Sequence, residues 1–141
     1  IRRIEPDGTT TTLAGSGQGD LDGKGKGAKL RYPSGIALFG GLLYVADRDN
    51  DKIRTVTTDG LVNTLAGSQQ GDLDGAALSA KFWEPWGIAV AVDGSVYVSE
   101  VKNHQVRKVT QKQPCDDGDP CTKDTCDPTA GTCSHSKIPG C

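Results

Sequence analysis

TLAGSGQGDLDG, at residues 12–23, returns almost unchanged as TLAGSQQGDLDG at residues 64–75. The same separation of 52 positions places Ile1 over Ile53. The chain is therefore built from a repeated unit of about 52 residues. Internal repeats of this length, with several short strands in each period, are typical of propeller blades and solenoid turns.

The match extends well beyond this motif. AKLRYPSGIAL at residues 28–38 lies over AKFWEPWGIAV at residues 80–90. After one extra residue in the second copy, LYVADRDNDKIRTV at residues 43–56 lies over VYVSEVKNHQVRKV at residues 96–109. Two units that match along most of their length are expected to share one fold.

Turn signals rich in glycine, proline and aspartate divide each repeat into short strand-like runs. The apolar run at 35–39 follows a Pro-x-Gly breaker and predicts a strand buried on both faces. A long Gly-rich connection at 15–34 predicts a crossing from the outer strand of one sheet to the inner strand of the next, so the expected fold is an all-β propeller of four-stranded antiparallel sheets. The predicted strands are residues 1–5, 9–14, 35–39, 42–47, 52–58, 61–66, 87–92, 95–100 and 105–110.

Two pairs of segments carry a family resemblance. PSGIAL and LLYVADRDNDKIRTV, with PWGIAV and SVYVSEVKNHQVRKV, resemble NHL repeats, and TLAGSGQGDLDG followed by AKL resembles the connecting loop of bacterial members of that family. The resemblance covers residues 1 to about 110 and implies NHL-like propeller blades over residues 1–112. It does not imply one function, because propellers of one shape serve unrelated tasks.

The strand count predicts an incomplete ring. With strands named A to D from the inside outward, the chain supplies C-D, then A-B-C-D, then A-B-C, whereas a propeller closes with about 4 to 8 blades. Because an uncovered apolar sheet face is costly in water, further protein is expected to cover it.

Two hypotheses follow from this deficit. Copies of the chain assemble into a ring or fibre by blade stacking or strand donation, or the chain is an excised fragment of a larger secreted propeller that binds a ligand such as carbohydrate or protein. The start at Ile1 and the lack of methionine favour a processed or excised segment. The candidate donor strand consists of Thr9, Thr10, Thr11, Thr12 and Leu13.

All the cysteines lie in a C-terminal stretch with few apolar residues, which predicts a small disulfide-stapled module at residues 113–141 after a hinge at 111–114. The cysteine spacings contain no C-x-x-C pair, which makes a zinc site less favoured than disulfides. Disulfides predict an extracellular protein, secreted or on the cell surface, and the fifth cysteine is free, bonded to another chain, or left over from a cut array. The cysteines are Cys115, Cys121, Cys126, Cys133 and Cys141.

The tail sequence CDDGDPCTKDTCDP resembles Cys-rich repeats of the type CDDGNPCTxDTCDP in secreted bacterial proteins. Its carboxylates Asp116, Asp117 and Asp119 are a weak candidate site for Ca²⁺, against solvated loops between disulfides. The Asp-x-Asp pairs at 20–22 and 72–74 and the alternate aspartates at 47–51 are better explained as turns.

Other function classes find little support. The net charge of −2 and the lack of a basic cluster argue against nucleic-acid binding, and no apolar run is long enough to span a membrane. His104 and His135 have no Ser or Cys partner in a repeated position, so catalysis is not expected. No cofactor is expected either.

Trp83 and Trp86 depart from the repeat. They flank Pro85 where the first unit has Arg31 and Ser34. Rigid aromatic rings at such a junction can stack on a sugar or anchor a neighbouring subunit. The alternative is that both rings fill the gap between adjacent blades.

Overall fold

The computed structural model describes residues 1–110, 122–127 and 132–139. The chain divides into two compact units, Ile1–Thr110 and Gln111–Cys141. The boundary predicted between residues 112 and 113 lies two positions beyond this division. In the described ranges, no helix is long and apolar enough to cross a membrane.

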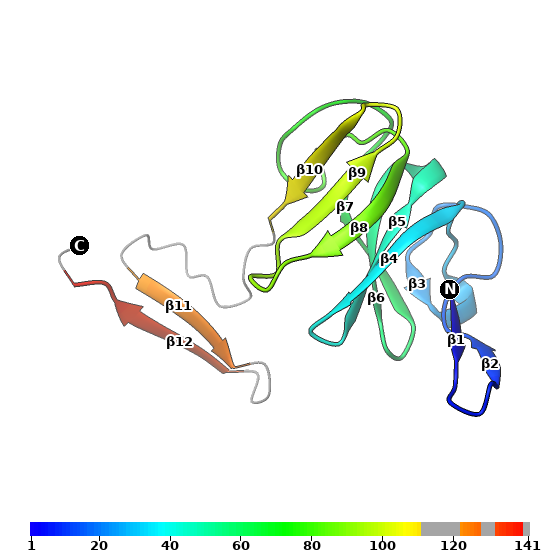
Figure 1. The fold of residues 1–141 in the computed structure, drawn as a ribbon, viewed down its shortest axis with the longest axis horizontal. Coiled ribbons are helices and arrows are strands. Elements are labelled where there is room, and N and C mark those ends of the chain that lie inside the picture. Colours follow the sequence, from blue (N-terminus) through cyan, green and yellow to red (C-terminus); the bar gives the residue numbers. More distant parts are fainter. Residues whose placement is uncertain (111–121, 128–131, 140–141) are drawn as a thin grey trace. The chain divides into compact units, whose positions relative to one another are not determined.

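The first blade is a five-stranded antiparallel sheet in the order β3-β7-β6-β5-β4 (Figure 1). Strands β4 to β7 fall on the predicted strands A to D. The two-residue strand β3 was not predicted: it comes from the long connection and pairs with the outer strand, Gly23 opposite Val62. The strands are β3 (Gly23–Lys24), β4 (Pro33–Phe39), β5 (Leu42–Asp47), β6 (Lys52–Thr57) and β7 (Leu61–Ala66).

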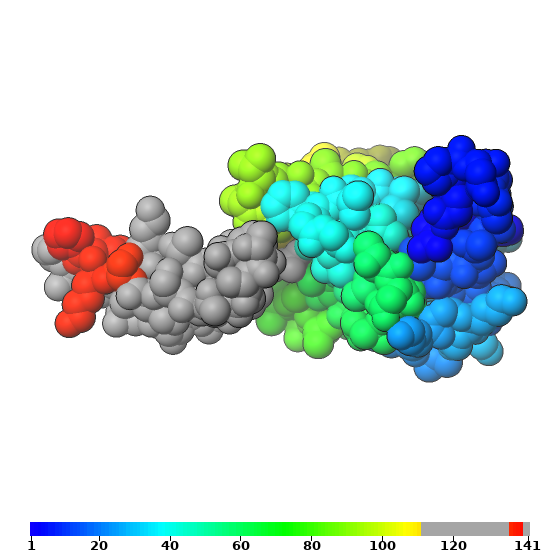
Figure 2. Space-filling view, turned by 90° about the horizontal axis from the view of Figure 1, so that it is seen from below, coloured from blue at the N-terminus to red at the C-terminus, as the bar shows by residue number. Residues whose placement is uncertain are grey.

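The second blade has three antiparallel strands in the order β10-β9-β8, and the N-terminal β1 and β2 form a separate hairpin. Figure 2 shows this N-terminal segment, in dark blue, at one end of the unit 1–110. In the described part of the chain the outer edge of β10 is unpaired. The strands are β1 (Arg2–Ile4), β2 (Thr10–Thr12), β8 (Pro85–Val90), β9 (Val96–Glu100) and β10 (Gln105–Val109); the short 3-10 turns are η1 (Gly25–Gly27) and η2 (Arg48–Asn50).

The inner strands β4 and β8 lie side by side (Figure 1). A Cβ atom at Gly35 would lie 2.4 Å from the carbonyl oxygen of Trp86, so this close approach requires glycine. Ser34 Oγ donates to the carbonyl oxygens of Pro85 and Trp86 at 3.2 and 2.9 Å. The two blades are thus joined backbone to backbone at their inner edge.

Two hydrophobic clusters repeat one another. The first lies between the N-terminal hairpin and the first blade, and the second between the two blades. Each uses equivalent positions of the 52-residue repeat. The first contains Ala14, Ala28, Leu30, Val45, Val56 and Val62; the second contains Tyr44, Ile53, Ala66, Ala80, Phe82, Val96, Val98 and Val109.

The prediction that residues 35–39 are buried on both faces is wrong. Ile36 and Leu38 on β4 are exposed. The reason is that β4 is the inner edge strand of its sheet, and its alternate side chains point away from the interface between the blades. Sequence hydrophobicity alone does not distinguish such an edge strand from a central one.

In the second unit, β11 (Thr122–Asp127) and β12 (Thr132–Lys137) form an antiparallel hairpin. The register places the backbone of Cys126 opposite that of Cys133. Cys115, Cys121 and Cys141, together with the calcium candidates Asp116, Asp117 and Asp119, lie outside the described residues. The disulfide framework therefore stays a prediction.

Candidate functional site

The second blade exposes side chains that the first blade buries. Tyr44 and Ile53 are 4% and 0% exposed beneath the second blade, whereas their repeat equivalents Tyr97 and Val106 are 38% and 69% exposed. We call Tyr97 and Val106 the open blade face. Because Tyr97 repeats Tyr44 and Val106 replaces Ile53 with another β-branched residue, this face has the chemistry of an interface between blades.

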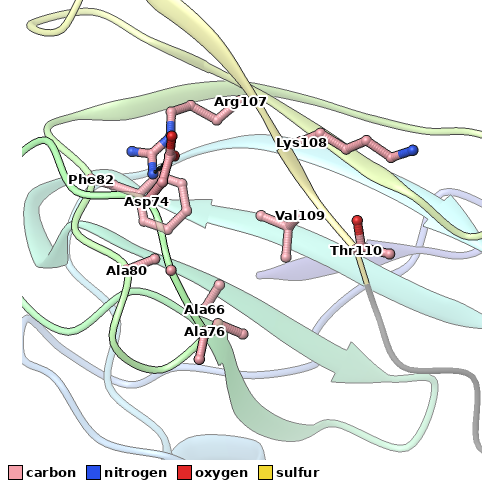
Figure 3. Close-up of a pocket in the computed structure, with 11 residues that line it drawn as sticks. Ala66, Asp74, Ala76, Ala80, Phe82, Arg107, Lys108, Val109 and Thr110 are labelled. Atoms are coloured by element: carbon pink, nitrogen blue, oxygen red, sulfur yellow. Dashed lines mark hydrogen bonds and ion pairs between the residues drawn. The ribbon is translucent and has the colours of Figure 1, made fainter. Parts of the chain in front are cut away.

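A cavity of about 230 Å³ lies beside β10, at the outer edge of this blade (Figure 3). Its walls include Val109 and Gly75, which are the repeat equivalents of Val56 and Gly23. In the first blade, Val62 of β7 pairs with both Val56 and Gly23. The cavity therefore lies where a fourth strand would pair with β10, a strand that the described residues of the second blade do not include.

A buried arginine connects each long loop to its blade. Arg54, 1% exposed, donates from Nη1 to Asp20 at 2.9 Å and to Thr64 Oγ1 at 2.7 Å. Its Nε lies 3.5 Å from Asp47 Oδ2, a carboxylate that is fully buried. The arrangement holds the Asp-x-Asp loop against strands C and D.

The same network recurs in the second blade with a gap. Arg107 donates to Asp74 Oδ1 at 2.5 Å (Figure 3). It also donates to the buried carboxylate of Glu100 at 3.3 Å. In the first blade the equivalent loop carboxylate, Asp22, also accepts from the backbone N–H of Thr64 at 3.0 Å. That donor belongs to an outer strand with no counterpart among the described residues of the second blade, and the Asp74 side chain is 95% exposed.

These loop aspartates are not arranged as a metal site. In the described ranges, no group of three or more His, Cys, Asp or Glu side chains is placed to hold a metal ion. The turn interpretation of the aspartates at 47–51 agrees with η2, although Asp47 itself is buried. The sequence analysis did not predict that the Asp-x-Asp pairs bind these arginines. The sequence did contain an indication, because the Asp-x-Asp pair and the arginine both recur in each repeat, as Arg54 and Arg107 show.

The surroundings lower the pKa of Asp20 and raise the pKa of Asp47. Burial favours the neutral form of Asp20, but the hydrogen bond from Lys52 and the charges of Lys52 and Arg54 outweigh it and lower its pKa. Burial raises the pKa of Asp47, against the hydrogen bonds that it accepts from Arg31 and Asn50 and the charge of Arg54. The ionised carboxylate of Asp20 therefore stabilises the fold, whereas the burial of Asp47 opposes ionisation of its carboxyl group.

We expect Asp20→Asn to lower the free energy of unfolding by about 1 kcal/mol at pH 7, since the carboxylate is partly exposed. Its pKa is lowered on folding from the ordinary value of 3.8. The stabilisation is present above that value and is lost as pH falls through the folded pKa. Urea titrations from pH 7 to pH 2.5 should show the difference between wild type and variant disappearing.

The matched control is Asp72→Asn. Asp72 accepts from the neutral Gln105 at 2.8 Å, where Asp20 accepts from Lys52. We expect a smaller stability loss for this variant at pH 7. A constant difference between wild type and Asp20→Asn across the pH range would contradict the assignment.

A second group of residues lies where η2 meets the starts of β4 and β8. The guanidinium carbon of Arg48 lies 5.2 Å from the Tyr32 ring centroid and 5.6 Å from that of Trp86. Arg48 Nε donates to Asp49 at 2.7 Å. That hydrogen bond raises the pKa of Arg48, against desolvation and together with nearby Glu84. We call Tyr32, Arg48, Asp49, Glu84 and Trp86 the loop-face cluster.

The predicted site residues fall in separate places. Trp86 is half exposed in the loop-face cluster, and Trp83, 37% exposed, lines an adjoining cavity. Neither ring is fully enclosed between the blades. The predicted donor strand, Thr9 to Leu13, coincides with β2 and its flanks, and its threonines are exposed. Arg48 and Tyr32 were missed, because only the fold brings them to Trp86.

Comparisons with known proteins agree with this architecture. The family model described as the NHL repeat matches residues 30–54, which contain β4, β5 and the start of β6, and residues 82–109, which contain β8, β9 and β10. Human NHL repeat-containing protein 2 is 38% identical over 97 residues, or 63% of this chain and 13% of that protein. Human teneurin-4 is 33% identical over 104 residues, or 62% of this chain and 4% of that protein. The chain thus spans a small part of these relatives.

Two solved structures share the fold. A Bacteroides thetaiotaomicron protein of unknown function matches 76% of this chain and 28% of its own, with a TM-score of 0.70 and 28% identity. An auxiliary nutrient binding protein from Bacteroides ovatus matches 79% of this chain and 32% of its own, with a TM-score of 0.66 and 27% identity. The fold and these matches define an all-β, propeller-type unit with two segments that match the NHL repeat.

A different family model, described as the Dictyostelium (slime mold) repeat, matches residues 114–138. It is not the Cys-rich repeat of secreted bacterial proteins predicted for this tail. That resemblance stays a prediction.

Proposed function

We propose that this chain is a non-enzymatic interaction protein whose open blade is completed by a second copy. The observation that carries the proposal is the exposure of Tyr97 and Val106 at positions where Tyr44 and Ile53 are buried. In assembled copies, the open blade face of one copy packs against the first blade of the next. The contact is head to tail, so repetition builds a ring or a fibre.

The strand that fits the cavity beside β10 is β2 of the second copy. Thr12 is the repeat equivalent of Thr64, and both are followed by Leu-Ala-Gly. In the place of Thr64, Thr12 donates its N–H and hydroxyl to Asp74 and accepts from Arg107. Addition of a strand to an open sheet edge is a common mode of recognition, with main-chain hydrogen bonds supplying affinity.

The chain's own residues after β10 are a poorer strand by sequence. Residues 113–117 read Gln-Pro-Cys-Asp-Asp, with no β-branched side chain and a proline that cannot donate to a ladder. Two adjacent carboxylates would also lie near Asp74. The threonine-rich β2 has the β-propensity that this position favours.

Donation of β2 requires it to leave β1. The present pairing joins Arg2 to Thr12 through three residue pairs, and both strands are exposed. In the assembly, β10 of the neighbour takes the place of β1, and Val106 takes the place of its repeat equivalent Ile1. In the isolated chain, β1 therefore occupies the position beside β2 that β10 of another copy takes in the assembly.

Composite blades set the size of the assembly. Each copy contributes one complete blade and one blade built from β8, β9, β10 and the neighbour's β2, so each copy adds two blades. Closure with about 4 to 8 blades gives a ring of about 2 to 4 copies. An extracellular location is part of the proposal, because the cysteine-rich tail suits an oxidising compartment.

Native mass spectrometry and sedimentation over a series of protein concentrations, with and without reductant, test the proposal. We expect an oligomer that resists reductant and is abolished by Tyr97→Glu or Val106→Glu, which place a charge on the open blade face. Val92→Glu is the control, since Val92 is 96% exposed on a turn outside that face. A monomer at every concentration overturns self-assembly.

A second candidate function is that of a ligand-binding propeller in a longer protein. It is favoured by the length of the relatives, because this chain spans only 13% or less of each of the two human proteins. Here the missing strand and blades come from the same, longer polypeptide, and the completed propeller binds a ligand. A stable monomer of this chain that associates with a separately expressed A-B-C-D blade set would support this candidate. The two candidates share the open blade face and differ in what covers it.

A further inference from the structure

The loop-face cluster combines aromatic surfaces with hydrogen-bonding groups of both kinds. Arg48 lines two adjoining cavities, one of about 280 Å³ with Tyr32 and Trp86, and one of about 260 Å³ with Trp83 and Glu84. Tyr32 is 63% exposed and Trp86 is 50% exposed. The rings hold the guanidinium between them and still offer open surface for a ligand.

The polar groups present donors and acceptors to the same space. Arg48 Nε donates to Asp49, and its two Nη atoms donate no hydrogen bond to the described residues. Asp49 and Glu84 provide carboxylate oxygens beside it, and the second cavity also contains Arg31 and Asp51. A ligand with many hydroxyl groups can satisfy both kinds of group, because a hydroxyl both donates and accepts.

The charge balance selects among ligands. Two arginines face three carboxylates, Asp49, Asp51 and Glu84, which leaves no positive excess to attract an anion. Aromatic faces stack on the apolar face of a sugar ring as they do on other apolar surfaces. Each cavity is smaller than the ~300–1,000 Å³ of sites for drug-sized ligands, so the fit is to a single small ring.

The backbone around the cluster is held in an uncommon conformation. Tyr32 and Glu84 occupy equivalent repeat positions, and both have φ of 50°, in the left-handed region. The N–H of Glu84 donates to Asp51 Oδ1 at 2.9 Å, which fixes this conformation. Strained backbone that the surroundings hold in place is concentrated at ligand sites.

We propose that the loop-face cluster binds a neutral pyranose ring of a carbohydrate. The ring stacks on Trp86 with Tyr32 beside it, its hydroxyls donate to Asp49 and Glu84, and they accept from the Nη atoms of Arg48. This site lies at the junction of β4 and β8, apart from the open blade face, so the inference does not rest on the proposed assembly.

The protein contains its own reporter. Trp83 and Trp86 are the only tryptophans, and both line these cavities. Fluorescence titration with methyl α- and β-glucopyranosides, methyl galactopyranosides, methyl mannopyranosides, cellobiose and xylobiose should give a saturable change for at least one sugar. The expected dissociation constant is about 1 mM, from the affinity per atom of small ligands.

The repeat supplies matched variants. Trp86→Ser and Arg48→Val install the residues of the equivalent positions in the other repeat, Ser34 and Val101. We expect each to weaken binding at least about tenfold, measured by calorimetry, with unchanged oligomeric state. Tyr97→Ser on the open blade face is the control and should bind as wild type does.

Three outcomes overturn the inference. They are no response to any of the neutral sugars, a response that both variants retain, and tighter binding of glucuronate or glucosamine than of their neutral counterpart. Loss of assembly with retained sugar binding would instead count against the proposed function alone.

Discussion

Arg54→Met is expected to lower the free energy of unfolding by about 3–5 kcal/mol at pH 7, because it removes one partner of a buried charge pair. The substitution keeps an apolar stem of similar length, so little packing is lost. It leaves the fully buried Asp47 without its cation and removes the donor to Asp20 and Thr64. Urea denaturation monitored by tryptophan fluorescence gives the measurement.

Two further measurements separate lost charge pairing from lost packing. The double variant Arg54→Met with Asp47→Asn should recover part of the loss, since the uncompensated charge is gone. Burial already raises the pKa of Asp47, and without Arg54 it should rise further. A raised folded pKa gives stability that is present below the unfolded pKa and lost as pH rises, so the deficit of Arg54→Met should shrink in acid. A loss under 1 kcal/mol, or one independent of pH, contradicts this account.

Phe82→Ala is expected to cost about 3–5 kcal/mol, the usual result of truncating a buried aromatic ring. Phe82 is 1% exposed in the cluster between the blades, and the guanidinium of Arg107 lies 4.9 Å from its ring centroid. The ring also borders the cavity beside β10, as Figure 3 shows. Truncation therefore enlarges an existing void, and the same urea titration measures the effect.

The repeat again provides the control. The equivalent of Phe82 in the first unit is Leu30, which is also buried. Phe82→Leu should cost less than about 1.5 kcal/mol, because it keeps most of the apolar volume. Equal losses for the alanine and leucine variants would mean that the ring is needed for its aromatic contact with Arg107, and that cavity formation is not the main cost.

Several features of the fold could be predicted because they depend on local pattern. Strands at residues 42–47 and 61–66 were predicted with the bounds that β5 and β7 have. The missing outer strand of the second blade followed from counting strands against the repeat. Errors arose where position in the sheet matters: Ile36 and Leu38 are apolar but lie on an inner edge strand, and their exposure depends on which neighbours are present.

The candidate sites were predicted less completely. Trp86 was identified as a departure from the repeat, but Arg48 and Tyr32 were not, because they are ordinary residues until β4 and β8 lie side by side. The Asp-x-Asp pairs were assigned to turns, which is how they lie in the chain. Their contacts with Arg54 and Arg107 join segments more than 30 residues apart.

The sequence by itself determined the period, the strand order within each blade and the deficit of one outer strand, since all three follow from repetition and from the alternation of turns and apolar runs. Tertiary structure alone decided which charges are buried together, which repeated tyrosine is covered, and which side chains share a cavity. These depend on distances between segments far apart in the chain, and packing sets such distances.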